Sequence, residues 1–163
     1  MIALSDKELV AWVEQTTTGW RGLIAQHPQI LDLPCDVRES KSVAELLRHI
    51  VAVELRYSER LHNLRETPYD SISFGSSTEI FATHDRAMAM LREVRELPEF
   101  DWEQELDFTT RSAGALRASR RTIFVHLLMH SIRHYAQLAT LVRQHGIKPG
   151  WQMDYLLMGV KQP

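Results

Sequence analysis

Four long segments in which apolar residues recur with helical spacing restrict the fold of this chain more than any other feature. Glycine (7) and proline (6) are scarce among the 163 residues and lie mostly at the boundaries of these segments. Gly19 and Gly22 are exceptions, because they lie inside the first segment and lower its helix propensity. The pattern predicts four long helices, from Ser5 to about Gln26, from Ser42 to about Arg65, from about Thr78 to Glu96 and from about Ser119 to Gln144.

Short-range signals mark where these helices begin and end. Ser5 is followed three residues later by Glu8, and Ser42 by Glu45, which is the pattern of a capping box at a helix start. Gly146, just after the fourth segment, predicts the end of the last helix. These signals support the helix assignment independently of the apolar pattern.

The connections are long, and one of them has a pattern of its own. Between residues 100 and 117, side chains such as Leu106 and Phe108 alternate with polar ones, which is typical of a short strand or a hairpin-like connection. A tail at residues 151–157 predicts one or two further helical turns. No repeat or linker divides the sequence. We therefore expect one all-α domain over residues 1–163, a four-helix bundle with a long connection before its last helix.

The charge balance and the cysteine content argue against several classes of protein. Nineteen Lys and Arg against 21 Asp and Glu give a net charge of -2, which is not expected of a nucleic-acid-binding domain. No apolar run reaches the about 18 residues of a membrane span, and the N-terminus lacks a signal-peptide pattern. The one cysteine, Cys35, cannot form an internal disulfide. We therefore expect a cytoplasmic protein without nucleic-acid or membrane partners.

Histidine is the residue type that stands out, with eight in the chain, roughly double an average usage of about two per cent. His126, His130 and His134 recur at every fourth residue of the fourth predicted helix. Neighbouring members lie about 6 Å apart along one helix face, a spacing at which two imidazoles can bind the same ion. The outer two are about 12 Å apart, so two alternative pairs remain, His126 with His130 and His130 with His134.

A transition-metal site needs at least one further ligand from another helix. His49 is the strongest candidate, because it lies in the apolar stripe of the second predicted helix. A histidine in such a stripe either forms an internal hydrogen bond or binds an ion, and the pattern leaves both alternatives open. His84 could line the same cavity, although it and the remaining histidines are more typical of structural or solvated positions.

Two carboxylates of the second predicted helix are candidates for a general base beside a bound water. Glu45 precedes His49 by four residues and shares its face, and Glu54 lies on a neighbouring face. The side chain of Glu45 is expected to be engaged in its capping box, and no motif supports Glu54. The sequence therefore assigns no catalytic residue.

Three segments, spread over nearly the whole chain, carry a resemblance to a known family. They are LLRHIVAVELRYSERL around His49, HLLMHSIRHYAQLATLVRQHGIKP on the fourth predicted helix, and the closing WQMDYLLMG. In these segments the sequence resembles the DinB/YfiT-like superfamily of metal-dependent proteins. The resemblance implies a four-helix bundle with up-down-down-up topology, often assembled as a homodimer.

Carried over residue by residue, the resemblance implies that His49, His130 and His134 bind one divalent ion, commonly nickel or zinc. The resemblance also places Gln137 next to the ligands, and His126, Glu45 and His84 are expected from their positions to line the cavity or support the ligands. The chain departs from the commonest form of the motif at Arg133, Tyr135 and Ala136. These departures leave the ligands intact but give no support to a substrate role borrowed from those positions.

Three neutral imidazoles leave a divalent ion its full charge and at least one open coordination position. Such an ion lowers the pKa of bound water and stabilises a bound thiolate, so hydrolysis and thiol transfer are both available. Members of the family include transferases that use low-molecular-weight thiols. We therefore expect a metal-dependent hydrolase or thiol transferase acting on a small molecule. The alternative is a non-catalytic, metal-stabilised binding or stress-response protein.

Overall fold

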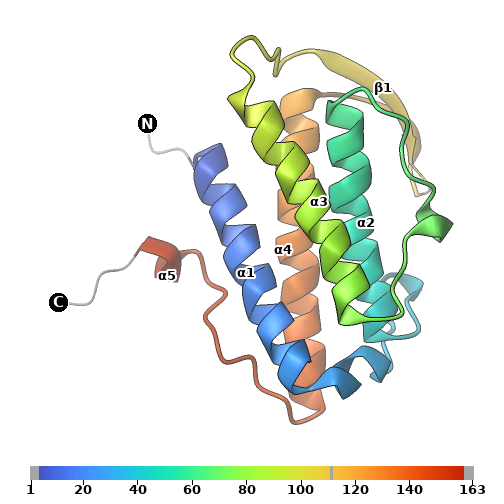
Figure 1. Cartoon of the computed structure of the whole chain (residues 1–163), viewed down its shortest axis with the longest axis vertical. Helices are drawn as coiled ribbons and strands as arrows, with labels where there is room; N and C mark the ends of the chain where they lie inside the picture. Colours follow the sequence, from blue (N-terminus) through green and yellow to red (C-terminus); the bar gives the residue numbers. More distant parts are fainter. Residues whose placement is uncertain (1–3, 111, 160–163) are drawn as a thin grey trace.

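The computed structural model describes residues 4–110 and 112–159, most of which lie in helices (Figure 1). Four helices are long and confirm the predicted helical segments: α1 (Asp6–Gln26), α2 (Val43–Leu61), α3 (Ser77–Glu96) and α4 (Arg120–Gln144). Shorter helical elements lie in the connections and the tail: η1 (Pro28–Asp32), η2 (Val37–Glu39), η3 (Tyr69–Ser71) and α5 (Leu156–Gly159).

The long helices pack around an apolar core. The most extensive contacts of α2 are with α3 and α4, and α1 packs mainly on α4. Each long helix contributes fully buried side chains, among them Trp20, Ile50, Leu91 and Leu127. In Figure 1 the connection between α2 and α3 (residues 62–76) runs back along the bundle, so the two helices start near the same end. Among the described residues, none of the helices combines the length and the apolar character that crossing a membrane requires.

Capping interactions explain where α1 and α2 begin. The capping box of Ser5 is complete: the Glu8 N–H donates to the Ser5 hydroxyl at 3.2 Å, and the Ser5 N–H donates to the Glu8 carboxylate at 2.8 Å. At α2 only half of the predicted box forms. The Glu45 N–H donates to the Ser42 hydroxyl at 3.3 Å, but the Glu45 carboxylate accepts a hydrogen bond from the Lys41 N–H at 2.9 Å.

The end of α2 differs from the prediction, whereas the end of α4 confirms it. α2 stops at Leu61 because Asn63 adopts a left-handed φ of 55° and the Leu64 N–H donates to the Glu59 carbonyl at 2.9 Å. These two features close the helix in a Schellman motif. Leu64, which the apolar stripe included, is 54% exposed. In α4 the same role falls to Gly146, with a φ of 78°.

A β-hairpin precedes α4, which confirms the strand or hairpin-like connection expected there and adds a small sheet to an otherwise helical chain. Strand β1 (Glu105–Thr110) pairs antiparallel with β2 (Gly114–Ser119). Phe108 is half-buried against the core, while Asp107 accepts a hydrogen bond from the exposed Arg117 at 2.6 Å. The alternation of apolar and polar residues in β1 reflects these two faces of the hairpin.

The C-terminal tail packs against α1. The Trp12 indole N–H donates to the Met153 carbonyl at 2.8 Å, and the Trp151 ring lies against Gly19. A Cβ atom at position 19 would overlap this ring, which explains a glycine inside a helix. The predicted additional turn is α5, which begins at Leu156, later in the tail than expected.

Candidate metal centre

His49 of α2 meets His130 and His134 of α4 where these two helices pack together. The Nε2 atoms of His49 and His130 are 3.0 Å apart. The ring centroid of His134 lies 5.0 Å from that of His49 and 4.4 Å from that of His130. One ring nitrogen from each residue lies within 4.8 Å of the others, so the three form a cluster that could hold a metal ion. Of the two alternative pairs, this cluster contains His130 and His134.

The spacing of the nitrogens suits such an ion. Two nitrogens bound to one ion at about 2.0–2.1 Å lie roughly 2.8–3.0 Å apart in octahedral geometry and roughly 3.3–3.4 Å apart in tetrahedral geometry. The 3.0 Å between the Nε2 atoms of His49 and His130 matches the octahedral separation. The complete set extends to 4.8 Å, so the rings would have to move closer together to bind one ion.

Burial keeps two imidazoles of the cluster, those of His130 and His134, unprotonated. His130 and His134 are 7% and 1% exposed. Desolvation lowers the pKa of His130 to about 2, and the neighbouring His134 and His49 act in the same direction. Desolvation also lowers the pKa of His134 to about 4, an effect that a hydrogen bond to Gln137 opposes and the charge of Arg133 reinforces. Both imidazoles are therefore unprotonated at neutral pH, which is the form that binds metal.

Hydrogen bonds define the tautomer of His134. Arg133 Nη2 lies 3.1 Å from His134 Nε2, and because a guanidinium can only donate, Nε2 is the acceptor. The proton therefore resides on Nδ1, which donates to Gln137 Oε1 at 2.6 Å. Gln137 thus orients the ring in the way that outer partners orient metal-binding histidines. An ion bound at Nε2 would have to displace the Arg133 guanidinium.

His126 borders the cluster but is not part of it. Its ring centroid lies 5.7 Å from that of His130 and 5.5 Å from that of Tyr57. Its side chain is exposed, although partial burial and the charge of Arg133 still lower its pKa. A role of His126 in lining the cavity stays a prediction.

Glu45 and His84, which were also expected near the cavity, interact elsewhere. The Glu45 carboxylate binds the backbone of Lys41 at the start of α2. His84 of α3 is 4% exposed, and its Nδ1 lies 2.7 Å from Glu54 Oε2. Neither residue belongs to the three-histidine cluster.

The Glu54–His84 pair is the feature that sequence reasoning missed. Glu54 is fully buried, and its second carboxylate oxygen accepts a hydrogen bond from the Ser131 hydroxyl at 2.7 Å. The pair therefore connects α2 and α3 to α4, one residue beyond a histidine of the cluster. A signal was present, because Glu54 continues the buried helical series of Leu47 and Ile50 and so occupies a core-facing position.

Comparison with known proteins identifies a family to which the sequence is similar. The model of the DinB family matches residues 4–160, nearly the whole chain. A search of curated proteins finds no match. The matched range includes the four long helices and all three histidines of the cluster.

Proposed function

The chain belongs to the DinB family, and we propose that it is a divalent-metal-dependent enzyme acting on a small molecule. His49, His130 and His134 would hold one ion, nickel or zinc, and leave at least one coordination position open. The observation that carries the proposal is the cluster of three histidine nitrogens from two helices, with no carboxylate among them.

The residues around the cluster have definable tasks in this proposal. When bound, the ion would acidify a water or thiol and stabilise the resulting anion. Burial keeps the His130 imidazole unprotonated, and the hydrogen bond to Gln137 holds the proton of His134 on Nδ1, so that Nε2 would bind the ion once Arg133 is displaced. His126, at the border of the cluster, would line the substrate cavity.

Of the two candidate reactions, transfer of a low-molecular-weight thiol has the stronger support. Hydrolysis usually needs a base beside the water, and the Glu45 carboxylate is engaged with the backbone of Lys41. Two positively charged side chains, Arg133 and Arg38, lower the pKa of His134. A positive surrounding favours an anionic ligand such as a thiolate. A hydrolase is the second candidate.

The proposal extends to the organisation of the chain. We propose a single domain over residues 1–163, the up-down-down-up helix order, a homodimer and a cytoplasmic location. The helix order is supported by the connection at residues 62–76, which returns along the bundle in Figure 1. The net charge of -2 supports a small-molecule substrate in preference to nucleic acid.

Elemental analysis of protein purified without an affinity tag tests the metal site. We expect close to one nickel or zinc per chain, and nearly complete loss of it in His49→Ala and His130→Ala. The exposed His145, at the C-terminal end of α4, supplies the matched control His145→Ala. An unchanged metal content in His49→Ala would contradict the ligand set. Turnover in a screen of thiols and electrophiles should disappear on chelation and return with the metal.

A non-catalytic, metal-stabilised binding or stress-response protein is the alternative function. It is favoured by the placement of the ligands on two helices, because an ion would then cross-link α2 to α4. This alternative predicts that metal raises the unfolding temperature, by an amount that depends on metal concentration, while no turnover accompanies it. Turnover that requires the metal and His130 would exclude it.

A further inference from the structure

Arg120, the first residue of α4, is buried far from the histidine cluster. The residue is only 8% exposed. Ten residues separate it from His130, which corresponds to about 15 Å along the helix axis. A cation at this depth normally has an acidic partner, because removing it from water is costly. Its surroundings therefore indicate what the site is built to bind.

The guanidinium of Arg120 lacks that partner. Its Nε is buried without a hydrogen bond, and its Nη1 reaches the Asp101 carbonyl only at 3.4 Å. Its other neighbour is the ring of Phe100, 4.4 Å from the guanidinium carbon. Among the described residues, no carboxylate forms an ion pair with it.

Other arginines of the chain show that this is unusual. Arg48, Arg56 and Arg60 also have a buried nitrogen without a hydrogen bond. Each of them nevertheless pairs with an acid, Arg48 with Asp70 and the other two with Glu66. Arg120 is thus a buried arginine whose planar donor groups are not matched by an anion of the described chain.

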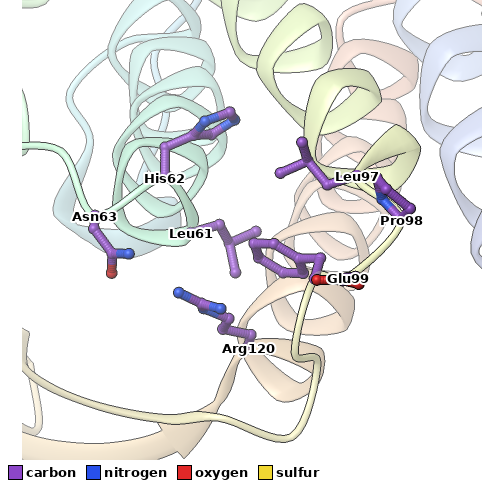
Figure 2. Close-up of a pocket in the computed structure, with 8 residues that line it drawn as sticks. Leu61, His62, Asn63, Leu97, Pro98, Glu99 and Arg120 are labelled. Atoms are coloured by element: carbon purple, nitrogen blue, oxygen red, sulfur yellow. The ribbon is translucent and has the colours of Figure 1, made fainter.

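The guanidinium faces a pocket at this end of the bundle. Figure 2 shows Arg120 with its charged group directed toward Leu61 and Asn63, and Leu97 and Pro98 across the pocket. The pocket has a volume of about 430 Å³. This volume is within the range of small-molecule sites, about 300–1,000 Å³. Glu99 also lines the pocket but is not in ion-pair contact with Arg120.

The backbone at the start of α4 offers little to an anion. The N–H groups of Arg120 and Arg121 donate to the carbonyls of Gln104 and Trp102, at 3.0 Å and 2.9 Å. The Thr122 N–H donates to the Ser119 hydroxyl at 3.2 Å. Recognition of an anion would therefore depend on the Arg120 side chain.

We propose that this pocket binds a small organic carboxylate with an apolar body, at a site separate from the histidine cluster. The Arg120 guanidinium would donate to the carboxylate in the parallel geometry that its planar fork favours. Leu61, Leu97 and Pro98 would pack against the apolar body of the ligand. An inorganic anion could use the guanidinium but would gain nothing from these apolar side chains.

Titration of the ¹⁵N-labelled full chain with octanoate tests the proposal. We expect saturable shifts of the Asn63 and Leu97 amides, and much weaker binding of acetate and inorganic phosphate. Arg120→Met keeps the apolar stem and removes the charge, so it should weaken octanoate binding at least about tenfold. Arg121→Met is the matched control, because Arg121 is exposed and pairs with Glu103; its affinity should equal that of the unaltered protein.

Three results would overturn the proposal: no saturable shift at Asn63 and Leu97, equal octanoate affinity in Arg120→Met, or phosphate binding as tight as octanoate. Leu97→Glu is a second variant in case Arg120→Met does not fold. Leu97 is 51% exposed, so this change should leave the bundle folded. The added carboxylate would repel the ligand, and we expect a loss of at least about tenfold. Unchanged affinity in Leu97→Glu would also count against the site.

Discussion

The buried histidines of the cluster and the buried His84 of α3 have opposite electrostatic surroundings. His130 and His134 lie among imidazoles and near cations, and burial lowers their pKa values to about 2 and about 4. His84 is as deeply buried, and burial alone would lower its pKa, but Glu54 at 2.7 Å reverses the direction and raises it. Only a neutral imidazole has a lone pair for an ion. The adjacent carboxylate, more than burial, therefore decides which buried histidine is available to a metal.

Removing Glu54 is the strongest way to break this comparison. Glu54→Ala leaves His84 without its buried partner and removes one acceptor of the Ser131 hydroxyl, so we expect the free energy of unfolding to fall by about 3–5 kcal/mol. Urea denaturation at pH 7 measures it. The control is Glu103→Ala, which removes the exposed partner of Arg121 and should cost at most about 1 kcal/mol. A loss in Glu54→Ala no larger than that of the control would show that the buried pair is not structural.

Lowering the pH should weaken the metal-free protein through the histidine cluster. Below the ordinary histidine pKa of about 6.5, the unfolded chain binds protons that His130 and His134 do not bind in the folded state. The free energy of unfolding therefore decreases as the pH is lowered, by at most about 1.4 kcal/mol per pH unit for each residue. Urea denaturation at pH 7 and pH 5.5 measures this slope. It should be shallower in His130→Gln, and identical slopes would be evidence against the depressed pKa.

His84 should show the opposite dependence. Its pKa is raised in the folded state, so its stabilising charge is fully present below pH 6.5 and is lost as the pH rises through the folded-state value. Imidazole ¹⁵N shifts recorded from pH 6 upward should show that His84 titrates above the ordinary histidine pKa of about 6.5. In Glu54→Gln the charge of the partner is removed, and the pKa of His84 should fall. A His84 that titrates below about 6.5 in the unaltered protein would remove the contrast with the cluster.

The smallest expected effect concerns the histidine cluster and the affinity with which it binds metal. Arg133 donates to His134 Nε2 and adds a positive charge beside it, so it competes with an ion. Arg133→Met should therefore tighten zinc binding several-fold, measured by competition with a chromophoric chelator. Arg143→Met, an exposed change in the last turn of the same helix, should leave the affinity unchanged. Equal affinities in the two variants would mean that the Arg133 contact does not oppose the metal.

Features determined by neighbouring residues were predictable from the sequence. Capping at Ser5, the end of α4 at Gly146 and the shared face of His130 and His134 all depend on residues a few positions apart. The hairpin alternative was visible for the same reason, in the alternation around Phe108. The early end of α2 was not, because Asn63 is only one of several residue types that adopt a left-handed φ.

Features that depend on the packing of distant segments were not predictable in this way. His49 could form a hydrogen bond or join an ion site, and only the packing of α2 on α4 brings it to His130. The partner of Glu54 could not be identified from local sequence, because His84 is 30 residues away. The burial of Arg120 could not be predicted either, because it results from the packing of α4 against the preceding connection.

Because Gly19 contacts Trp151, the effect of a substitution at Gly19 depends on whether the C-terminal tail is packed on α1. A glycine inside a helix costs about 1 kcal/mol relative to alanine, whether or not the tail is docked. In the whole chain, Gly19→Ala would regain that amount but force the Trp151 ring away from α1. In a chain that ends before residue 151, the same substitution would only stabilise the helix. The sign of this one substitution's effect therefore reports whether the tail is seated on α1.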